Sequence, residues 1–495
     1  MAKTRFYPDR TIIRGGTVVL ADRLVTDHDV VIEGGRIVAV EPSSEALPAG
    51  CRLVDATGCY VAPGFVDIHS DYIENVASPR PSVVMDLRAA LYGVDRSLVI
   101  HGVTTIYHSL SIYGYTPFEH KPIRQFQNVA KMIELIDGMR LSETLDHLIR
   151  HRLHLRLELD AVDRYHEVEQ MLLDGRLDML SFMDHTPGQG QYRDLAVYSD
   201  TLKGYQEQLS DADVDKIIAQ QQAQPKLSLA QISRLAELAR EQGVAVASHD
   251  DDTQETLEFI WKMGATISEF PISLDVAHNA IELGMHTVAG APNVVLGYSH
   301  SGNLSARESI CQGATSILCS DYYPEALLRA VFVLHRTCGI DLAEAFALVT
   351  INPARAVGID DEYGEIAVGK RADILLIREL HAGVVAQNGE RAHADEPHPA
   401  GESHPAGTQH PAGESHPAGT QHPAGEPEEI IALVEEVFVE GRSVLKTYYS
   451  KVQRADVIMA DTDIPERTND AANDCAARLR DRAQEAAELT VGALP

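Results

Sequence analysis

This chain of 495 residues has few cationic side chains, a single tryptophan and no long apolar run. Its 42 Lys and Arg residues face 73 Asp and Glu residues, which gives a formal net charge of −31 at pH 7. A strongly negative protein repels phosphate backbones and anionic lipids, so nucleic acids and membranes are not expected partners. No segment reaches the ~18 apolar residues needed to span a bilayer. The stretch 1–6 also lacks the apolar core of a secretory signal.

Cysteines are sparse, scattered and without a CxxC pair: Cys51, Cys59, Cys311, Cys319, Cys338 and Cys475. Disulfide-rich secreted scaffolds need a dense cysteine framework, and many zinc sites need closely spaced pairs. Neither pattern is present, so the sequence predicts a cytoplasmic protein with reduced thiols. The length allows one large core and a smaller second core.

Short β-strands separated by glycine turns dominate the first part of the chain. Apolar and β-branched runs lie at 11–13, 17–20, 29–33, 36–40 and 53–55, with turns at Gly15-Gly16 and Gly34-Gly35. Similar runs return at 364–376 and 435–446. We expect these two sets of strands to form one small β-sandwich that is discontinuous in sequence.

Between these sets, a strand, a polar tip and a helix alternate repeatedly. The strand candidates are 65–71, 104–108, 154–158, 179–185, 244–249, 267–270, 293–297 and 316–321. Apolar residues at helical spacing cover 229–242, 255–263, 274–283 and 324–338, and each run stops at a glycine. Eight such units predict an α/β fold, a parallel (β/α)₈ TIM-like barrel with its active site at the carboxyl ends of the strands.

The predicted domains follow from these patterns. The first part of the β-sandwich covers 1–62, and the barrel, with the chemistry of a metal-dependent hydrolase, covers 63–358. The second part of the sandwich covers 359–447, and a tail predicted to be helical covers 448–495. A loop after His185 extends to about residue 228 and contains a helical stretch at 211–224, and we interpret this loop as a lid because of its length.

A low-complexity insert at about 393–427 interrupts the second part of the sandwich. His-Pro-Ala-Gly repeats there with a twelve-residue period, alternating Glu-Ser and Thr-Gln endings. Proline and glycine at this density, without apolar periodicity, predict a disordered surface loop. Metal scavenging by the spaced histidines is the functional alternative.

A candidate metal site begins at the end of the first barrel strand, with His69 and Asp71. Side chains two apart on a strand share a face, and imidazole with carboxylate is a common ligand pair for divalent metals. Alone, the pair would instead favour a buried histidine bonded to a nearby carboxylate. Glu158, His185 and His249 also end strand candidates, and together these five predict a metal site at the strand tips.

Other strand-tip residues have the chemistry to support such a site. Two cations need a shared bridging ligand, which Glu158 could supply. Asp321 ends the eighth strand candidate and could orient or deprotonate a water as general base. Glu269 is a lower-ranked candidate, as ligand, as partner of a ligand or as substrate contact. Residues with donors for an anionic substrate lie near the same tips, and they are Arg80, Arg156, Gln189, His300 and Asn303.

The order of these motifs resembles that of the amidohydrolase superfamily. The shared features are Pro-Gly-Phe-Val-Asp-Ile-His-x-Asp, then Asn-Pro-Ala and Gly-Lys-Arg-Ala-Asp. Within it the chain resembles the PhnM family of the carbon–phosphorus lyase pathway, through 69–74, 78–81, 151–158, 183–189, 247–251, 290–293, 299–303 and 320–324. The resemblance runs from about residue 11 to 376 and resumes near 435.

The resemblance implies hydrolysis of α-D-ribose 1-methylphosphonate 5-triphosphate to the 5-phosphate and diphosphate, within phosphonate catabolism. It implies two divalent ions such as Zn or Mn, a small-molecule ribose triphosphate substrate and, by analogy only, a homo-oligomer. The chain has His-x-Asp in place of His-x-His and no evident Lys for a carbamate, so a carboxylate bridge is the simpler expectation. A metal-dependent amidohydrolase acting on a cyclic amide or N-acyl amino acid is the alternative, and a non-catalytic barrel scaffold is the second.

Overall fold

The structure, a computed structural model, describes residues 10–44, 48, 50–114, 122–140, 147–205, 209–299, 303–381 and 430–447. The predicted insert, the predicted tail and His300 lie outside the described residues. Within the described part of the chain, no helix has the length and apolar character needed to cross a bilayer.

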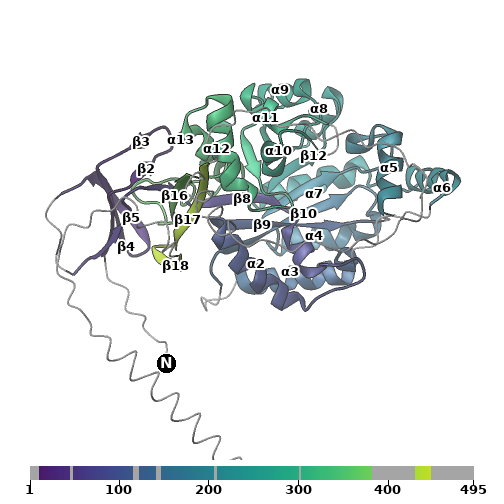
Figure 1. Ribbon diagram of the computed structural model, residues 1–495. Coiled ribbons are helices and arrows are strands. Elements are labelled where there is room, and N and C mark those ends of the chain that lie inside the picture. Colours follow the sequence, from purple (N-terminus) through teal and green to yellow (C-terminus); the bar gives the residue numbers. More distant parts are fainter. Residues whose placement is uncertain are drawn as a thin grey trace, which may run out of the picture. The chain divides into compact units, whose positions relative to one another are not determined.

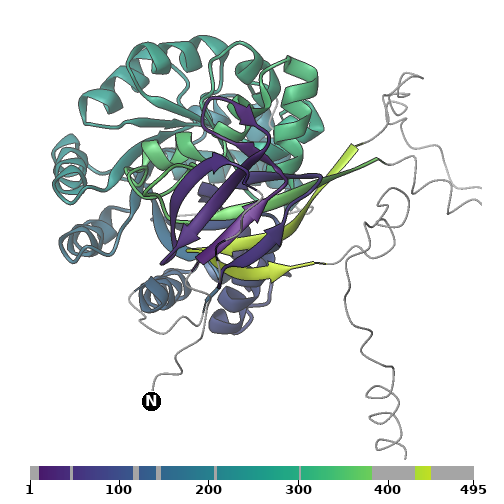
Figure 2. The ribbon, with the colours of Figure 1, turned by 90° about the vertical axis from the view of Figure 1, so that its left-hand side faces the viewer.

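Eight parallel strands form the central sheet and confirm the predicted TIM-like barrel (Figures 1 and 2). They pair in sequence order, and a bridge between Ser70 and Asp321 brings the last strand beside the first, so the barrel is nearly closed. The strands are β8 (Phe65–Ser70), β9 (Val103–Ile112), β10 (Arg150–Glu158), β11 (Met179–Met183), β12 (Ala245–His249), β13 (Ile267–Glu269), β14 (His286–Gly290) and β15 (Ile317–Cys319).

Side-chain alternation along these strands builds two apolar layers. Leu153, Leu155 and Leu157 of β10 belong to the core between strands and helices, whereas His154 and Arg156 lie on the opposite face, as period two requires. Ile68 of β8 belongs to a separate apolar cluster inside the barrel, which draws residues from seven of the eight barrel strands, including Val288 and Ile317. The barrel is thus filled by side chains at one end, which leaves the carboxyl end of the strands for polar groups.

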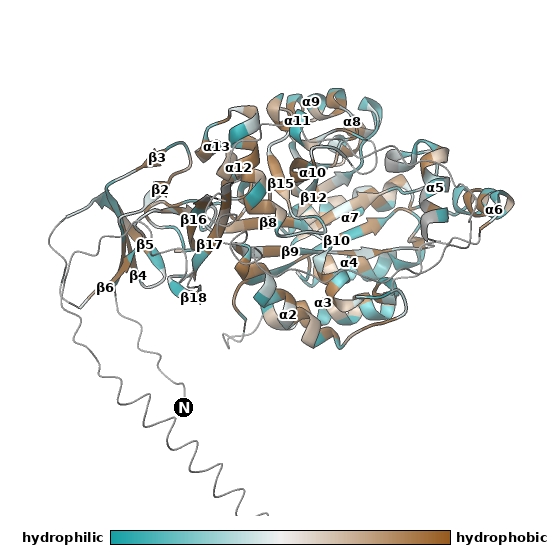
Figure 3. Ribbon diagram, viewed as in Figure 1, coloured by the Kyte–Doolittle hydropathy of each residue, from teal (hydrophilic) through white to brown (hydrophobic). Residues whose placement is uncertain are grey.

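Helices cover the outside of the barrel, with apolar faces toward the strands (Figure 3). Ser228 caps the N-terminus of one of them, with a capping box to Gln231. The α-helices are α1 (Tyr72–Ala77), α2 (Leu87–Ile100), α3 (Phe126–Arg140), α4 (Tyr165–Leu173), α5 (Leu195–Tyr205), α6 (Asp211–Gln222), α7 (Leu229–Glu241), α8 (Gln254–Lys262), α9 (Leu274–Glu282), α10 (Ala291–Leu296), α11 (Ala306–Cys311), α12 (Ala326–Cys338), α13 (Leu342–Ala347) and α14 (Ile351–Ala356). Short 3₁₀ turns are η1 (Pro122–Arg124), η2 (Val162–Arg164) and η3 (Gly190–Tyr192).

The predicted seventh barrel strand is wrong. The segment 293–297 lies mostly in helix α10, and the strand is β14, which comes seven residues earlier. A short apolar run with β-branched residues is compatible with a strand or with a buried helical turn, and periodicity cannot separate them. Pro292 in the first turn of α10 and the left-handed Gly297 after it are the helix signals.

Two sheets outside the barrel form the predicted sandwich from both ends of the chain. One has the order β5-β4-β1-β6 and the other β18-β17-β16-β7-β2-β3, and Figure 2 shows the C-terminal strands beside the N-terminal ones. Leu375 and Ile377 pack on the barrel side, whereas Ile374 and Leu376 pack against the smaller sheet. The strands are β1 (Arg10–Arg14), β2 (Thr17–Val19), β3 (Leu24–Val25), β4 (His28–Glu33), β5 (Arg36–Pro42), β6 (Arg52–Asp55), β7 (Cys59–Pro63), β16 (Ile374–His381), β17 (Ile430–Val439) and β18 (Arg442–Lys446).

The strands of this sandwich differ from the predicted ones in several places, since β3 and β7 were not predicted and β17 begins earlier than expected. Regular pairing begins at Ile374, so the expected strand at 364–376 is only partly correct. The strands β16 and β17 are antiparallel neighbours, and their pairing ends with His381 opposite Ile430. The long segment between them therefore starts and ends at adjacent points of one sheet. The predicted domain limits stay a prediction.

A disulfide joins Cys311 of α11 to Cys338 of α12, contrary to the expectation of reduced thiols throughout. Their Cα atoms are 5.2 Å apart, within the range that a disulfide spans. The pair could not be found from spacing because the two cysteines are 27 residues apart and meet only through the packing of two helices.

The long connection after β11 contains η3 and the helices α5 and α6, so it is mostly helical. Tyr198, Leu202 and Val214 form a small apolar core of their own. Two contacts hold the base of this connection. Lys226 contacts the Asp184 carboxylate at 2.6 Å, and the Gly190 N–H donates to Asp252 at 3.0 Å. Closure of this segment over a ligand stays a prediction.

Candidate active site

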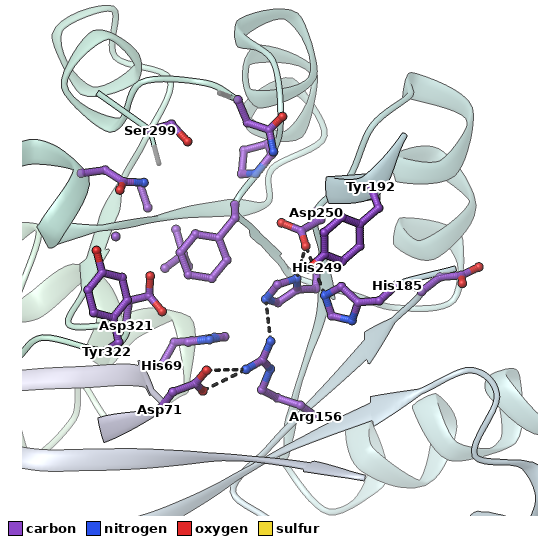
Figure 4. A pocket seen from close by; sticks show the side chains of 18 of the residues that line it. His69, Asp71, Arg156, His185, Tyr192, His249, Asp250, Ser299, Asp321 and Tyr322 are labelled. Carbon is purple, nitrogen blue, oxygen red and sulfur yellow. Dashed lines mark hydrogen bonds and ion pairs between the residues drawn. The ribbon is translucent and has the colours of Figure 1, made fainter. Parts of the chain in front are cut away.

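A cavity of about 460 Å³ opens at the carboxyl ends of the barrel strands (Figure 4). It brings together eight of the residues predicted from the sequence, namely His69, Asp71, Arg156, Glu158, His185, His249, Asn303 and Asp321. Arg80 and Gln189 are exposed and lie outside the cavity lining. The cavity thus contains all five predicted metal ligands and the predicted base, but only part of the predicted substrate shell.

Three strand ends turn into the cavity through an unusual backbone conformation. Asp250, Phe270 and Asp321 follow β12, β13 and β15, and their φ angles are 54°, 55° and 56°. Left-handed φ values are costly for residues with a Cβ, above all for a bulky aromatic, and they concentrate at functional sites. Here the positive φ angles turn the backbone at the end of each strand, so that residues adjacent in sequence both face the cavity.

The first candidate metal cluster consists of His69, His154 and Glu269, all deeply buried. Nδ1 of His69 is 2.8 Å from Oε1 of Glu269, and Oε2 of Glu269 accepts a hydrogen bond of 2.8 Å from Ser181. Nδ1 of His154 lies 3.1 Å from the Ile68 carbonyl oxygen, and its Nε2 contacts Ser181. Both oxygens of Glu269, both nitrogens of His154 and Nδ1 of His69 are therefore already engaged in hydrogen bonds within the protein.

The second candidate cluster consists of His185, His249 and Asp250. Oδ2 of Asp250 lies 2.9 Å from Nδ1 of His249 and 3.5 Å from Nε2 of His185. The first two of these atoms are buried, and neither has a well-formed hydrogen bond to any described residue. Buried polar atoms are almost always paired, and two nitrogens and a carboxylate oxygen form a ligand set suited to zinc or similar ions. This second cluster therefore fits a divalent metal better than the first.

Glu158 orients His185 in the second cluster. Its carboxylate contacts Nδ1 of His185 and accepts a hydrogen bond of 3.3 Å from the backbone N–H of the same residue. Burial works to lower the pKa of His185, but Glu158 and Asp250 raise it well above its usual range. A carboxylate on one ring nitrogen directs the other nitrogen toward a metal, so Glu158 is placed as an orienting partner of a ligand.

Arg156 lies between Asp71 and His249, as Figure 4 shows. Its Nη1 donates to both carboxylate oxygens of Asp71 at 2.9 Å, and its Nη2 is 3.2 Å from Nε2 of His249. Burial works to raise the pKa of Asp71, but Arg156 and His69 lower it to about 2. Asp71 is therefore ionised and already paired with a cation.

Asp321 combines burial with nearby negative charge. Its backbone N–H donates to the His69 carbonyl at 3.1 Å, and its carbonyl accepts from the Asp71 N–H at 2.6 Å, which holds it at the closure of the barrel. Burial, followed by the Asp71 carboxylate, raises the pKa of Asp321 to about 7. A carboxyl group with this pKa can accept a proton and release it near neutral pH.

The described cavity lining carries more acids than cations. Its carboxylates are Asp71, Glu158, Asp160, Asp184, Asp250 and Asp321, whereas its arginines are Arg124 and Arg156. Arg124 donates to Glu74 at 2.9 Å and lies over the ring of Tyr113. Such a lining attracts metal cations and needs them before it can accept an anion.

Sequence reasoning missed two members of the metal clusters. Asp250 directly follows His249, and strand alternation predicts that neighbours point to opposite faces. Its positive φ breaks that rule, and no sequence signal showed it. His154 shares a strand face with Arg156 and Glu158, and that spacing could have marked it as a candidate.

Comparison with known proteins identifies the family of the chain. The profile described as the amidohydrolase family matches residues 60–394. The chain belongs to the amidohydrolase family. The resemblance seen in the motifs is confirmed.

Among individual amidohydrolase relatives, one is the α-D-ribose 1-methylphosphonate 5-triphosphate diphosphatase of Escherichia coli (strain K12). It is 32% identical over 381 residues, covering 74% of this chain and 98% of the relative. An imidazolonepropionase of Symbiobacterium thermophilum is 25% identical over 401 residues, covering 74% of this chain and 85% of that protein. A prolidase solved with N-methylphosphonate-L-proline has a TM-score of 0.54 at 16% identity, covers 88% of this chain and 100% of that one, and shows the shared fold alone.

Proposed function

We propose that this amidohydrolase hydrolyses α-D-ribose 1-methylphosphonate 5-triphosphate to the 5-phosphate and diphosphate, with a divalent metal. The observation that carries the proposal is the similarity to the diphosphatase of Escherichia coli, which extends over 98% of that relative. The cavity residues His69, Asp71, His185 and Asp321 lie within the matched motifs. The carbon–phosphorus lyase pathway is the metabolic setting that the similarity suggests.

The chemistry of the site supports a phosphoric-anhydride hydrolase. A bound divalent ion would lower the pKa of a coordinated water and offset phosphoryl charge. Asp321, with a pKa of about 7, would take a proton from the attacking water at its carboxylate. Diphosphate is a good leaving group, so neutralising negative charge matters more than strong acid catalysis.

Recognition of the triphosphate must overcome the acidic lining. At least three of the five N–H groups of Arg156 are already engaged with Asp71, His249 and Met183. Asn303 also lines the cavity. Because these groups are few, we propose that the metal carries most of the phosphate binding and that Arg156 and Asn303 position the chain of phosphates.

A metal-dependent amidohydrolase is the second candidate, and one observation favours it. Six carboxylates line the cavity against two arginines, one of which is paired with Glu74. A neutral cyclic amide tolerates such a lining more easily than a triphosphate does. A non-catalytic scaffold is less well supported, because scaffolds that descend from enzymes lose metal-binding groups, and the second cluster is complete.

A substrate panel with purified protein tests these alternatives. Diphosphate release should be strong with ribose 5-triphosphates and weak with ordinary nucleoside triphosphates or a buffer blank. A chelator should abolish the strong release. Hydrolysis of a cyclic amide or an N-acyl amino acid without diphosphate release would support the second candidate. Metal-bound protein that turns over neither class would contradict both enzymatic proposals.

A further inference from the structure

One cation in the cavity is supplied by the chain itself. The guanidinium of Arg156 lies between Asp71 and His249, two residues that the sequence assigned to metal (Figure 4). Its Nη1 donates to both Asp71 oxygens, its Nε donates to Sδ of Met183 at 3.1 Å, and its Nη2 contacts His249. All three of its nitrogens are engaged, so its position is held from three sides.

These contacts limit what Asp71 can do. Both of its carboxylate oxygens accept from a side chain that does not deprotonate in proteins. The pair is largely buried, with 8% of the Arg156 side chain and 18% of the Asp71 side chain exposed. An ion on Asp71 would have to displace a buried guanidinium, and leaving that group unpaired is costly.

The second cluster has the opposite character. Nδ1 of His249 and Oδ2 of Asp250 lie 2.9 Å apart, are buried, and lack a well-formed hydrogen bond among the described residues. Nε2 of His185 is directed to the same oxygen at 3.5 Å while Glu158 holds its other nitrogen. Three potential ligand atoms thus converge on this side of the cavity without well-formed hydrogen bonds between them, an arrangement that suits a divalent cation.

We propose that the protein holds one divalent ion, on His185, His249 and Asp250, and that Arg156 takes the place of a second ion beside Asp71. The inference rests on the metal dependence of the proposed function and not on its substrate. A neutral imidazole has one lone pair, so an ion on Nδ1 of His249 leaves the proton on Nε2. Arg156 then gives up that contact, while its two hydrogen bonds to Asp71 remain.

A fixed guanidinium differs from a second metal in ways that matter for the site. It cannot be removed by chelators or exchanged for another ion, and it offers a directed N–H to a phosphate oxygen. Asp71 becomes a positioning residue, because its role is to hold Arg156. The ion count expected from the family resemblance is thereby reduced from two to one.

Metal analysis of matched variants tests the proposal. The full-length protein is equilibrated with excess Mn²⁺ or Zn²⁺, separated from free ion by gel filtration, and its metal measured by mass spectrometry. We expect one ion per chain in the wild type and in Asp71→Asn, and at least a tenfold weaker ion affinity in Asp250→Asn. The two variants make the same chemical change at two carboxylates of one cavity, so each is the control of the other.

Folding is checked by circular dichroism and thermal melting before metal is counted. Should Asp71→Asn fail to fold because Arg156 is left unpaired, the double variant Asp71→Asn with Arg156→Gln removes both charges and gives the same reading. Two ions per wild-type chain, or loss of the ion from the Asp71 variants, would overturn the proposal. The readout is bound metal, so it is independent of which substrate the enzyme hydrolyses.

Discussion

Among single residues, Asp321 is the best placed to take a proton, because it is buried, faces the cavity and has a pKa raised to about 7. Asp321→Asn keeps the size of the side chain and removes the base. We expect kcat to fall by ~10²–10⁴-fold, as is typical for loss of a general base, with KM and metal content nearly unchanged. Steady-state kinetics and metal analysis of the same preparation check this. A variant with near wild-type kcat and normal metal would rule out Asp321 as the base.

The same group predicts a pH profile. The base must be ionised to accept a proton, so activity is present above its pKa and is lost as the pH falls through that value. The pKa of about 7 holds without a bound ion, and a nearby cation lowers it. We therefore expect an acidic limb in kcat/KM centred at or below pH 7, which should be absent from the residual activity of Asp321→Asn. A limb that persists in this variant would belong to another group.

For Glu158 the predicted effect is on metal affinity, because this residue acts through His185. Glu158→Gln keeps a hydrogen-bond acceptor but removes the charge that orients and polarises the imidazole. Loss of such an outer partner typically weakens metal binding by ~10–100-fold. Competition titration with a coloured chelator measures the affinity. Glu167→Gln, on the exposed face of α4 beside Arg164, is the matched control and should bind metal like the wild type.

For whole elements, sequence patterns predicted most of the barrel because strands and helices of ordinary length have distinct periods. The helices that stop at Gly243, Gly264 and Gly284 were found to within two residues. The error at 293–297 arose where a six-residue helix and a five-residue strand are adjacent. Both are too short for a period to be read, so only the proline and glycine at the helix ends distinguish them.

The candidate site was predictable to the extent that its residues obey strand alternation. His154, Arg156 and Glu158 all face the barrel interior, as residues two apart should. Asp250 does not follow this rule, because its φ of 54° turns the chain directly after β12. Nor could the pairing of Asp71 with Arg156 be foreseen, since residues 85 positions apart meet only when β8 and β10 curve into one barrel.

A buried network of polar side chains joins the barrel strands β9 and β10 to helix α2 on the outside of the barrel. Nε2 of His108 in β9 lies 2.8 Å from Nδ1 of His151 in β10, and Nε2 of His151 lies 3.0 Å from Asp95 in α2. Burial is the largest cause that lowers the pKa of both histidines. As the pH falls, these histidines are protonated in the unfolded chain, at a pKa of about 6.5, before they are protonated in the folded protein. Folding stability is therefore lost as the pH falls below that value.

This network gives a prediction for stability and not for turnover. His108→Asn removes one neutral buried imidazole, so the loss of melting temperature between pH 7 and pH 5 should be smaller than in the wild type. The comparison of two pH values within each protein cancels the cost of the substitution itself. An equal or larger loss in the variant would show that His108 is not protonated on unfolding in this range.

At the scale of the whole molecule, the large insert between β16 and β17 should be dispensable. Its repeat composition predicts no core, and the flanking residues His381 and Ile430 are paired neighbours in one sheet. We expect deletion of about 397–427 to change neither the melting temperature nor kcat appreciably, because the antiparallel pair can be joined by a shorter connection. Differential scanning calorimetry and the diphosphate assay measure this. A marked loss of either would assign the repeats a structural or catalytic role.

The pairing of β7 with β16 also has a consequence for synthesis on the ribosome. β7 ends at Pro63, and its antiparallel partner begins at Ile374. The emerging chain can therefore build every barrel strand before the sheet beside it has its central partner. Contacts between segments so far apart in sequence form slowly, so β7 must wait with an open edge, beside β2 and β3, until β16 leaves the exit tunnel. Such an edge is where a nascent chain is most exposed to mispairing.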